Sequence, residues 1–133
     1  MSVLIIAEAG VNHNGDVNVA LQLCKAAKEA GADIIKFQTF KTELVLTKNA
    51  ALAEYQAKNT GASQTQYEMI KELELDYESF RKIKEYCDQI GIEFLSTPDD
   101  VESLNFLVSD LKLKRIKIGS GEITNIPFLR IVG

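Results

Sequence analysis

Polar side chains that could bind and transform a small anion follow short apolar runs in this sequence. Lys36 and Lys117 each lie between bulky apolar residues, where a lysine is costly unless it has a partner or a function. Glu8 and Glu122 are candidate proton donors or acceptors. The other candidates offer an amide or a hydroxyl: Gln38, Ser96, Thr97 and Ser120. Two cations with hydroxyls suit a small dianion such as a phosphorylated carboxylate, and the glutamates suit proton transfer.

Each candidate also has a structural interpretation. Either lysine could be exposed at a sheet edge or ion-paired, and Glu8 could be the structural partner of Lys36 or Lys117. Glu122 could be a carboxylate at a helix N-terminus. The turn of small residues at 119–121 could offer backbone N–H groups to a phosphate, but it matches neither a P-loop nor a dinucleotide-binding fingerprint. These alternatives stay open on the residues alone.

The single histidine and the two cysteines are the other residues with potential chemistry. We interpret His13 as a turn residue hydrogen-bonded to backbone rather than as a metal ligand. Cys24 and Cys87 lie within apolar helical patterns, so we interpret both as small core residues rather than as a disulfide or a metal pair. No cluster in the sequence has the spacing of metal ligands.

Four runs of about five residues are typical of buried strands. They are residues 3–7, 33–37, 92–96 and 114–118. The first run is continuously apolar, as expected of a strand that is covered on both faces.

Helical spacing of apolar residues alternates with these strands. The predicted helices cover residues 20–30, 80–90, 101–107 and 126–132, and a long insert holds a loop at 55–61 and a short amphipathic helix at 67–73. We expect Gly31 and Gly91 to end the first two long helices. Asp76 is expected to cap the second, and Asp99 with Glu102 to open the third.

This alternation predicts an α/β fold with a parallel sheet. All strands of such a sheet end at the same edge, where ligands bind in open α/β folds and in (β/α)8 barrels. The polar residues at the strand ends therefore gather around one mouth. They indicate an α/β enzyme, or part of one, that acts on a small phosphate-bearing anion.

Length and composition fit one globular domain and exclude several functions. The chain has 133 residues, a net charge of −4 and a pI of about 5.0, so it lacks the basic field of a nucleic-acid-binding protein. No apolar run approaches the roughly 20 residues that a membrane span needs. The start of the chain lacks the basic leader of a signal peptide, which makes the cytoplasm the expected location.

Five segments, in order, resemble the sialic acid synthase family, which comprises N-acetylneuraminate synthases and their legionaminate and pseudaminate relatives. The segments are IIAEAGVNHNGD (5–16), GADIIKFQTF (31–40), AEYQAKNTG (53–61), FLSTPDD (94–100) and KIGSGEITNIPFL (117–129). The resemblance implies a TIM-type (β/α)8 barrel of which residues 1–133 supply the first four or so units. The remaining barrel and a small antifreeze-like C-terminal domain are expected to be absent from this chain.

The resemblance further implies a reaction. The family condenses phosphoenolpyruvate with an N-acylated aminosugar in its open-chain aldehyde form, and releases a nine-carbon 2-keto sugar acid and inorganic phosphate. The sugar acid is expected to be used in lipopolysaccharide or capsule biosynthesis. A divalent metal, Mn²⁺ or Mg²⁺, activates the aldehyde, and its ligands are expected outside this chain. The full-length enzyme is expected to be a homodimer that binds neither nucleic acid nor membrane.

Roles for individual residues also come from the resemblance. Four residues match positions that hold the carboxylate and phosphate of phosphoenolpyruvate: Lys36, Thr97, Lys117 and Ser120. Gln38 matches a sugar-side contact, and Asn59 a contact to the N-acyl group. Glu8 and Glu122 match the acidic pair that handles the sugar and activates the water that attacks C2 of the enolpyruvyl unit. Asp99 is a departure, because the family usually has an aromatic residue there.

Other readings remain beside this one. A (β/α)8 barrel takes about 250 residues, so we expect the N-terminal part of a longer enzyme, half of a split enzyme, or one of two copies that pair face to face, each inactive as this chain alone. Lys117 could instead form a Schiff base in an aldolase that acts on a pyruvate-type substrate. The chain could also be a non-catalytic half-barrel whose exposed faces serve as an interaction module.

Overall fold

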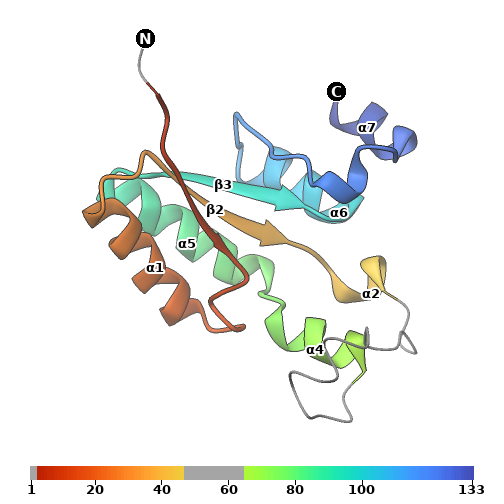
Figure 1. The fold of residues 1–133 in the computed structure, drawn as a ribbon, viewed down its shortest axis with the longest axis horizontal. Coiled ribbons are helices and arrows are strands. Elements are labelled where there is room, and N and C mark those ends of the chain that lie inside the picture. The colour runs from red at the N-terminus through yellow and green to blue at the C-terminus, as the bar shows by residue number, and fades with distance from the viewer. Residues whose placement is uncertain (1–2, 47–64) are drawn as a thin grey trace.

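A three-stranded parallel sheet forms the centre of the molecule (Figure 1). The computed structural model describes residues 3–46 and 65–133. The strands β1 (Ile6–Gly10), β2 (Ile34–Thr39) and β3 (Glu93–Pro98) follow one another in the sheet in chain order. The sequence-based prediction of a parallel α/β fold is therefore confirmed.

Two long helices make the crossovers and lie on the same side of the sheet (Figure 1). They are α1 (Val17–Glu29) and α5 (Tyr77–Ile90). Their apolar stripes pack into the core, in which Cys24 and Cys87 are fully buried. Consecutive strand order with helices on one face is the arrangement of a (β/α) barrel wall rather than of a doubly wound sheet.

The strand pleat divides the side chains of β2 between two faces. Ile35 and Phe37 belong to the core that packs against the helices. Alternation therefore turns Lys36 and Gln38 to the opposite face, which in a closed barrel is the interior. Lys36 is the register partner of Glu8 on one side and of Leu95 on the other.

The ends of the two long helices are close to the prediction. The Asp76 carboxylate accepts a hydrogen bond from the Ser79 N–H at 2.7 Å and caps α5. Gly91, with φ +72°, ends the same helix in the left-handed conformation. Gly31 directly follows Ala30, the C-cap residue of α1. Side-chain caps and C-terminal glycines thus set these boundaries as the sequence predicts.

The prediction that Asp99 opens the next helix is wrong by one residue. Asp100 is the N-cap of α6 (Val101–Asn105), and its carboxylate accepts from the Ser103 N–H at 2.7 Å. The Asp99 N–H instead donates to the Thr39 carbonyl at 3.1 Å, which continues the bonding between β2 and β3. Asp99 is therefore held by the sheet and its side chain is left for the strand-end site.

The prediction of a strand at 114–118 is also wrong for the structure described. After the π-helical turn η1 (Phe106–Asp110), the chain runs as coil to the 3₁₀ turn η2 (Ser120–Glu122) and then enters α7 (Ile126–Val132). The coil touches β3 through the Lys117 N–H, 3.4 Å from the Ser96 carbonyl. One such bond does not make a ladder, so the apolar pattern alone overstates the pairing.

The first strand starts later than predicted and is not covered on both faces. It begins at Ile6 instead of residue 3, and Leu4, Ile5 and Ile6 are each about half exposed. The described residues cover this edge of the sheet on the helix side, where Ala9 is buried. A continuously apolar run therefore predicts the tendency to be buried, not the cover itself.

Short helices of the insert lie near the carboxyl ends of the strands (Figure 1). They are α2 (Thr42–Val45) and α4 (Gln66–Leu73), and the latter confirms the predicted helix at 67–73. Glu74 joins them, because its carboxylate accepts from Thr42 Oγ1 at 2.7 Å and from Lys71 Nζ at 3.0 Å. The predicted loop at 55–61 lies outside the described residues.

In the described part of the chain, no helix has the length and apolarity to cross a membrane.

Candidate functional site

A short ion pair at the sheet edge joins two predicted site residues. Glu8 Oε2 lies 2.5 Å from Lys36 Nζ across neighbouring strands. The Lys36 side chain is 14% exposed and that of Glu8 is 55% exposed. The lysine is thus largely removed from water, whereas the glutamate is about half exposed. This pair can hold an anion and a proton acceptor side by side, although the contact also fits the structural alternative for Glu8.

Gln38 belongs to the same small group. Gly10 ends β1 with φ +53°, and a Cβ placed there would lie 3.3 Å from Glu8 Oε1 and 3.5 Å from Gln38 Oε1. The register between β1 and β2 is irregular at Glu8 and Gly10. The kink at a residue without a side chain therefore lets the glutamate and the glutamine converge over the end of the strand.

The end of β3 brings its hydroxyls to the same edge, but in different roles. Ser96 Oγ is 2.7 Å from Thr39 Oγ1, and both are fully buried, so Ser96 serves the packing of two strands. Thr97 is 4% exposed. Its Cγ2 lies 3.5 Å from the position of a Cβ on Gly119. The turn at 119–121 consequently passes over the end of β3, as the predicted mouth requires.

The chain at 117–122, which includes the turn over the end of β3, is called the covering segment below. It carries the remaining predicted site residues except Asn59. Lys117 is exposed, and its Nζ donates to the Ile118 carbonyl. Ser120 is exposed in η2. Glu122 accepts a hydrogen bond from Asn125 Nδ2 at 2.6 Å. The structure does not join Lys117 to the Lys36–Glu8 pair among the described contacts, and Asn59 is outside the described residues.

Two adjoining cavities open beside this group. One of about 510 Å³ reaches from Gln38 to α4, and the other, of about 400 Å³, extends toward α7. Asp99, Glu122 and Asn125 line both cavities. Of these, sequence reasoning assigned a role to Glu122 alone. Asn125 could have been found from its place three residues after Glu122 at the start of a helix, where side chains meet.

Asp99 has an unusual environment for a carboxyl. Its pKa is raised to about 6, first by burial and then by the nearby charges of Asp100 and Glu122, while Lys36 acts in the opposite direction. A carboxyl with such a pKa exchanges a proton near neutral pH. The sequence marked this residue as a departure from the family pattern but did not indicate that it borders both cavities.

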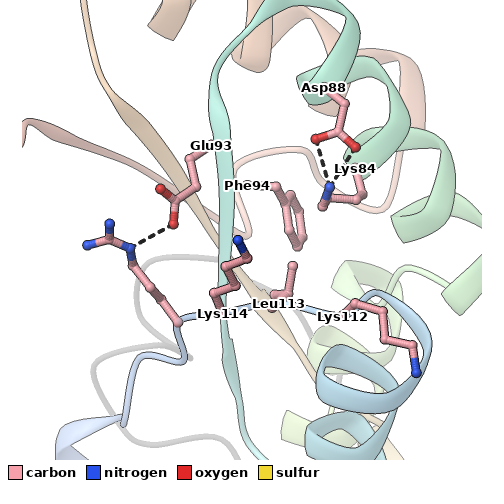
Figure 2. A pocket seen from close by; sticks show the side chains of 8 residues that line it. Lys84, Asp88, Glu93, Phe94, Lys112, Leu113 and Lys114 are labelled. Carbon is pink, nitrogen blue, oxygen red and sulfur yellow. Dashed lines mark hydrogen bonds and ion pairs between the residues drawn. The ribbon is translucent and has the colours of Figure 1, made fainter.

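A third cavity, of about 610 Å³, lies at the opposite end of β3 and is not part of this group (Figure 2). Lys84 bonds to Asp88 at 2.6 Å, and Arg115 to Glu93 at 3.0 Å. The space lies between the start of β3 and the coil at 112–115, where the predicted fourth strand does not pair. Its charged side chains are largely engaged with each other, so we do not assign it the chemistry.

His13 lies in a buried turn and the two cysteines lie in the core. His13 is 1% exposed, and its Nδ1 accepts from the Gly15 N–H at 3.0 Å, which confirms the turn interpretation. Cys24 and Cys87 are buried core residues with their sulfurs 3.5 Å apart. No group of three His, Cys, Asp or Glu side chains in the described residues could hold a metal ion. The divalent metal that the resemblance implies therefore has no ligand set among them.

The wall of consecutive βα units, with a polar mouth at the carboxyl ends of the strands, defines the class of (β/α) barrel enzymes. Within that class the chain belongs to the NeuB family, whose model matches residues 23–133. The match includes β2, β3 and the covering turn, which carry most of the candidate site.

Two similar proteins are synthases by name. The chain is 54% identical over 130 residues to an N,N'-diacetyllegionaminic acid synthase of Legionella pneumophila, covering 98% of this chain and 36% of that protein. It is 35% identical over 125 residues to the N-acetylneuraminate-9-phosphate synthase of Homo sapiens, covering 94% and 34%.

A solved structure supports the same fold. The N-acetylneuraminic acid synthetase of Leptospira borgpetersenii, in complex with citrate, superposes with a TM-score of 0.78 at 33% identity, over 98% of this chain and 41% of that chain. The chain therefore spans just over a third of the length of the curated relatives it matches. Membership of a sialic-acid-type synthase family and its α/β barrel architecture are established by these matches.

Proposed function

We propose that this chain contributes the phosphoenolpyruvate side of a sialic-acid-type synthase. The reaction joins phosphoenolpyruvate to the open-chain aldehyde of an N-acylated aminosugar and gives a nine-carbon 2-keto sugar acid and phosphate. The observation that carries the proposal is the Glu8–Lys36 contact of 2.5 Å at the carboxyl end of the sheet, close to Gln38, which borders a cavity together with Glu122.

Lys36 has the properties needed to hold the ligand's negative charge. It is a largely buried cation on the inner face of the sheet, where water screens it little and an anion gains most from it. Thr97 and Ser120, at the end of β3 and in the covering turn, supply hydroxyl groups for the carboxylate or phosphate. Lys117 lies on the same covering segment and completes the anion site in this proposal.

Glu8 and Glu122 are the proton-transfer residues of the proposal. C3 of phosphoenolpyruvate forms a bond to the aldehyde carbon, whose oxygen takes up a proton. Water adds to C2, a carboxylate accepts the proton of that water, and the C2–oxygen bond to phosphate breaks. The divalent metal would polarise the aldehyde, but the described residues offer it no ligands, so no step here depends on it.

The proposal does not specify which aminosugar is the substrate. The names of the relatives differ in the product, which is a diacetylated legionaminic acid in one and a 9-phosphate of N-acetylneuraminate in another. Gln38 lies at the border between the Lys36 group and the larger cavity, which supports its role as a sugar-side contact. Dimer formation, a cytoplasmic location and use in polysaccharide biosynthesis belong to the proposal as well.

The aldolase alternative has no specific observation in its favour. An imine-forming lysine works in a desolvated pocket, whereas Lys117 is exposed and engaged with a backbone carbonyl. An aldolase would trap pyruvate on reduction with borohydride, and the synthase predicts no adduct.

The test uses the intact protein, which here means the full-length enzyme that contains this chain. Release of phosphate from phosphoenolpyruvate is measured in the presence of Mn²⁺ and a panel of N-acylated aminosugars. We expect release that requires one class of sugar and falls by at least about a hundredfold in Lys36→Gln, because the fixed cation is lost. Lys25→Gln is the matched control, since Lys25 is an exposed lysine that pairs with Glu29 at 3.8 Å on α1. No release with any sugar would refute the proposal.

A further inference from the structure

A buried carboxylate joins the two short helices of the insert. The Glu74 side chain is 9% exposed, and its Oε2 accepts hydrogen bonds from the Thr42 N–H at 2.9 Å, from Thr42 Oγ1 at 2.7 Å and from Lys71 Nζ at 3.0 Å. Burial alone would raise the pKa of this carboxyl, but the bonds from Thr42 and Lys71 outweigh burial and hold the pKa below its ordinary value. Glu74 is therefore an ionised group that contacts both α2 and α4.

These bonds take the place of an N-cap that α2 lacks. Lys41 precedes the helix, and its side chain makes no cap hydrogen bond, because an ammonium group has no acceptor. The N–H groups at the start of a helix then need acceptors from elsewhere. Thr42 finds one in Glu74, and the Lys41 N–H donates to Asp100 Oδ2 at 2.8 Å. So short a helix is not stable on its own, and carboxylates from distant segments hold it in place.

The position of α2 matters because this helix forms part of a cavity wall. Leu44 and Val45 of α2, with Leu46 at its end, border the larger cavity at the strand ends. Gln38, near the end of β2 and just before this helix, borders the cavity as well. The contacts that hold Thr42 therefore also limit how far this wall can move.

Lys36 is held in a different way. Its backbone is paired with β1 on one side and with β3 on the other, and its Nζ is paired with Glu8. None of these contacts involves α2 or α4. Loss of Glu74 should therefore leave the group proposed for phosphoenolpyruvate in place.

A close backbone contact also fixes the chain at Glu74. A Cβ added to Gly15, in the turn after β1, would lie 2.3 Å from the carbonyl oxygen of Glu72 and 3.9 Å from that of Glu74. The turn and the chain at 72–74 thus pack backbone against backbone, without room for a side chain. The carboxylate consequently acts from a backbone that is itself held in place.

We propose that Glu74 is a positioning residue, which holds α2 as a wall of the larger cavity and thereby sets the KM for the aminosugar but not the KM for phosphoenolpyruvate. The inference rests on the proposed function, in which Gln38 lies on the sugar side and Lys36 holds phosphoenolpyruvate. Glu74 lines neither of the two cavities, so it acts through α2 and not by contact with a substrate.

The experiment compares leucine substitutions at two glutamates of one network in the intact protein. Glu74→Leu keeps a side chain of similar size and leaves both donors of Thr42 without this acceptor. Glu43→Leu is the matched control, because the half-exposed Glu43 carboxylate bonds to the same Lys71, at 2.8 Å, and also joins α2 to α4. Both KM values and kcat are measured by phosphate release, with the sugar of the panel that supports turnover.

We expect Glu74→Leu to raise the sugar KM by at least about tenfold, because hydrogen bonds to a charged group are lost, while kcat and the phosphoenolpyruvate KM change by less than about threefold. Glu43→Leu should leave all three quantities within about twofold of the wild type, since an exposed ion pair contributes little. Glu74→Gln should recover most of the lost affinity, because an amide oxygen can accept from Thr42.

Thr42→Val tests the same contact from the other residue. It removes the hydroxyl donor but keeps the shape of a fully buried side chain and the N–H bond to Glu74. We expect the sugar KM to rise by about threefold to tenfold, and to stay unchanged in Thr42→Ser, which retains the hydroxyl. If Glu74→Leu does not fold, the two Thr42 variants decide the question.

Amide hydrogen exchange reports the position of α2 without any measurement of activity. The Leu46 N–H donates to the Thr42 carbonyl at 3.0 Å and closes the helix. Its exchange should be at least about tenfold faster in Glu74→Leu than in the wild type, with the amides of β2 unchanged. Glu43→Leu should leave the exchange of Leu46 as it is in the wild type.

The outcomes separate this inference from the proposed function. A wild-type protein that releases no phosphate with any sugar refutes the proposed function, and the exchange of Leu46 then decides whether Glu74 holds α2. Unchanged exchange, or an unchanged sugar KM in folded Glu74→Leu, overturns the inference. Equal losses in kcat and in both KM values, or an equal effect of Glu43→Leu, would show a general structural role and overturn it as well.

Discussion

Glu8 Oε2 and Lys36 Nζ are 2.5 Å apart, and the two residues are direct register partners on adjacent parallel strands. The contact is asymmetric, because the lysine is largely buried while the glutamate is about half exposed. An ion pair with one exposed partner contributes little to stability. Its value to the protein is therefore expected to lie in the chemistry at the sheet edge.

Glu8→Gln distinguishes a catalytic from a structural role for this carboxylate. We expect phosphate release by the intact protein to fall by about 10² to 10⁴, the usual contribution of a general base. The free energy of unfolding should change by less than about 1 kcal/mol, since the pair is partly exposed. Both are measured on one preparation, by phosphate assay and urea denaturation.

The control for that variant is Glu29→Gln, which removes an exposed partner of Lys25 at 3.8 Å on α1. It should leave both readings unchanged. A Glu8→Gln protein that keeps its activity but loses several kcal/mol of stability would show that Glu8 is a structural partner of Lys36.

Gly10→Ala tests the convergence of side chains at the end of β1. Alanine at φ +53° is strained by about 1 kcal/mol. Its Cβ would also press on Glu8 Oε1 at 3.3 Å and Gln38 Oε1 at 3.5 Å. We expect a lower melting temperature and a loss of activity larger than that loss of stability explains.

Gly31→Ala is the matched control for Gly10, because Gly31 also has a positive φ, +85°, and a Cβ there meets nothing within 4 Å. It should lower the free energy of unfolding by about 1 kcal/mol through backbone strain alone and leave the activity unchanged. If the two variants were equally stable, the close approach over Gly10 would not be rigid enough to position the site.

The sequence predicts the parts of the fold that depend on local pattern. The strands at 33–37 and 92–96 are found because Phe37 and Phe94 are buried in the core that the helices complete. The first strand and the proposed strand at 114–118 depend on neighbours that a local pattern does not describe. Their exposed or unpaired state therefore lies beyond what apolar runs can show.

The site divides in the same way. Lys36 and Gln38 are predictable, because strand pleat and parallel topology alone send them to the inner face near the strand end. Asp99 and Asn125 gain their importance from the packing of α2, α4 and α7 around the cavities. Asn125 has a local signal in its place three residues after Glu122, but the cavity position of Asp99 depends on long-range packing that spacing does not show.

Asp99→Asn should stabilise the protein at alkaline pH. The folded-state pKa of Asp99 is about 6, above its ordinary value of 3.8, so the folded state holds its proton more tightly than the unfolded state. The contribution of Asp99 to stability therefore rises as pH falls from about 7 to 4. Removing the charge is expected to add about 1 to 2 kcal/mol at pH 8, allowing for solvent screening.

The measurement for Asp99 is urea denaturation at pH 8 and pH 4, where the gain should nearly vanish. The groups that act on this carboxyl are Asp100, Glu122 and Lys36, so Asp88→Asn, far from them on α5, serves as the control without a gain. A stabilisation equal at both pH values would show that the Asp99 charge is not the cause.

His13 gives the opposite pH dependence. Burial lowers its pKa below the ordinary 6.5, and its Nδ1 accepts from the Gly15 N–H at 3.0 Å, which leaves no room for a proton there. The unfolded chain binds a proton below pH 6.5 while the folded chain does not. Stability from His13 is therefore fully present above pH 6.5 and decreases below it, by at most about 1.4 kcal/mol per pH unit.

His13→Phe removes this titration and keeps a ring beside Phe37, whose centroid lies 6.1 Å from that of His13. The variant should be less stable throughout, by about 1 to 3 kcal/mol, because the Gly15 N–H loses its acceptor. The informative quantity is the slope of unfolding free energy between pH 6.5 and 5.5, which should be shallower than in the wild type. Identical slopes would mean that folded His13 takes up its proton as freely as in the unfolded chain, and that the buried turn opens to water.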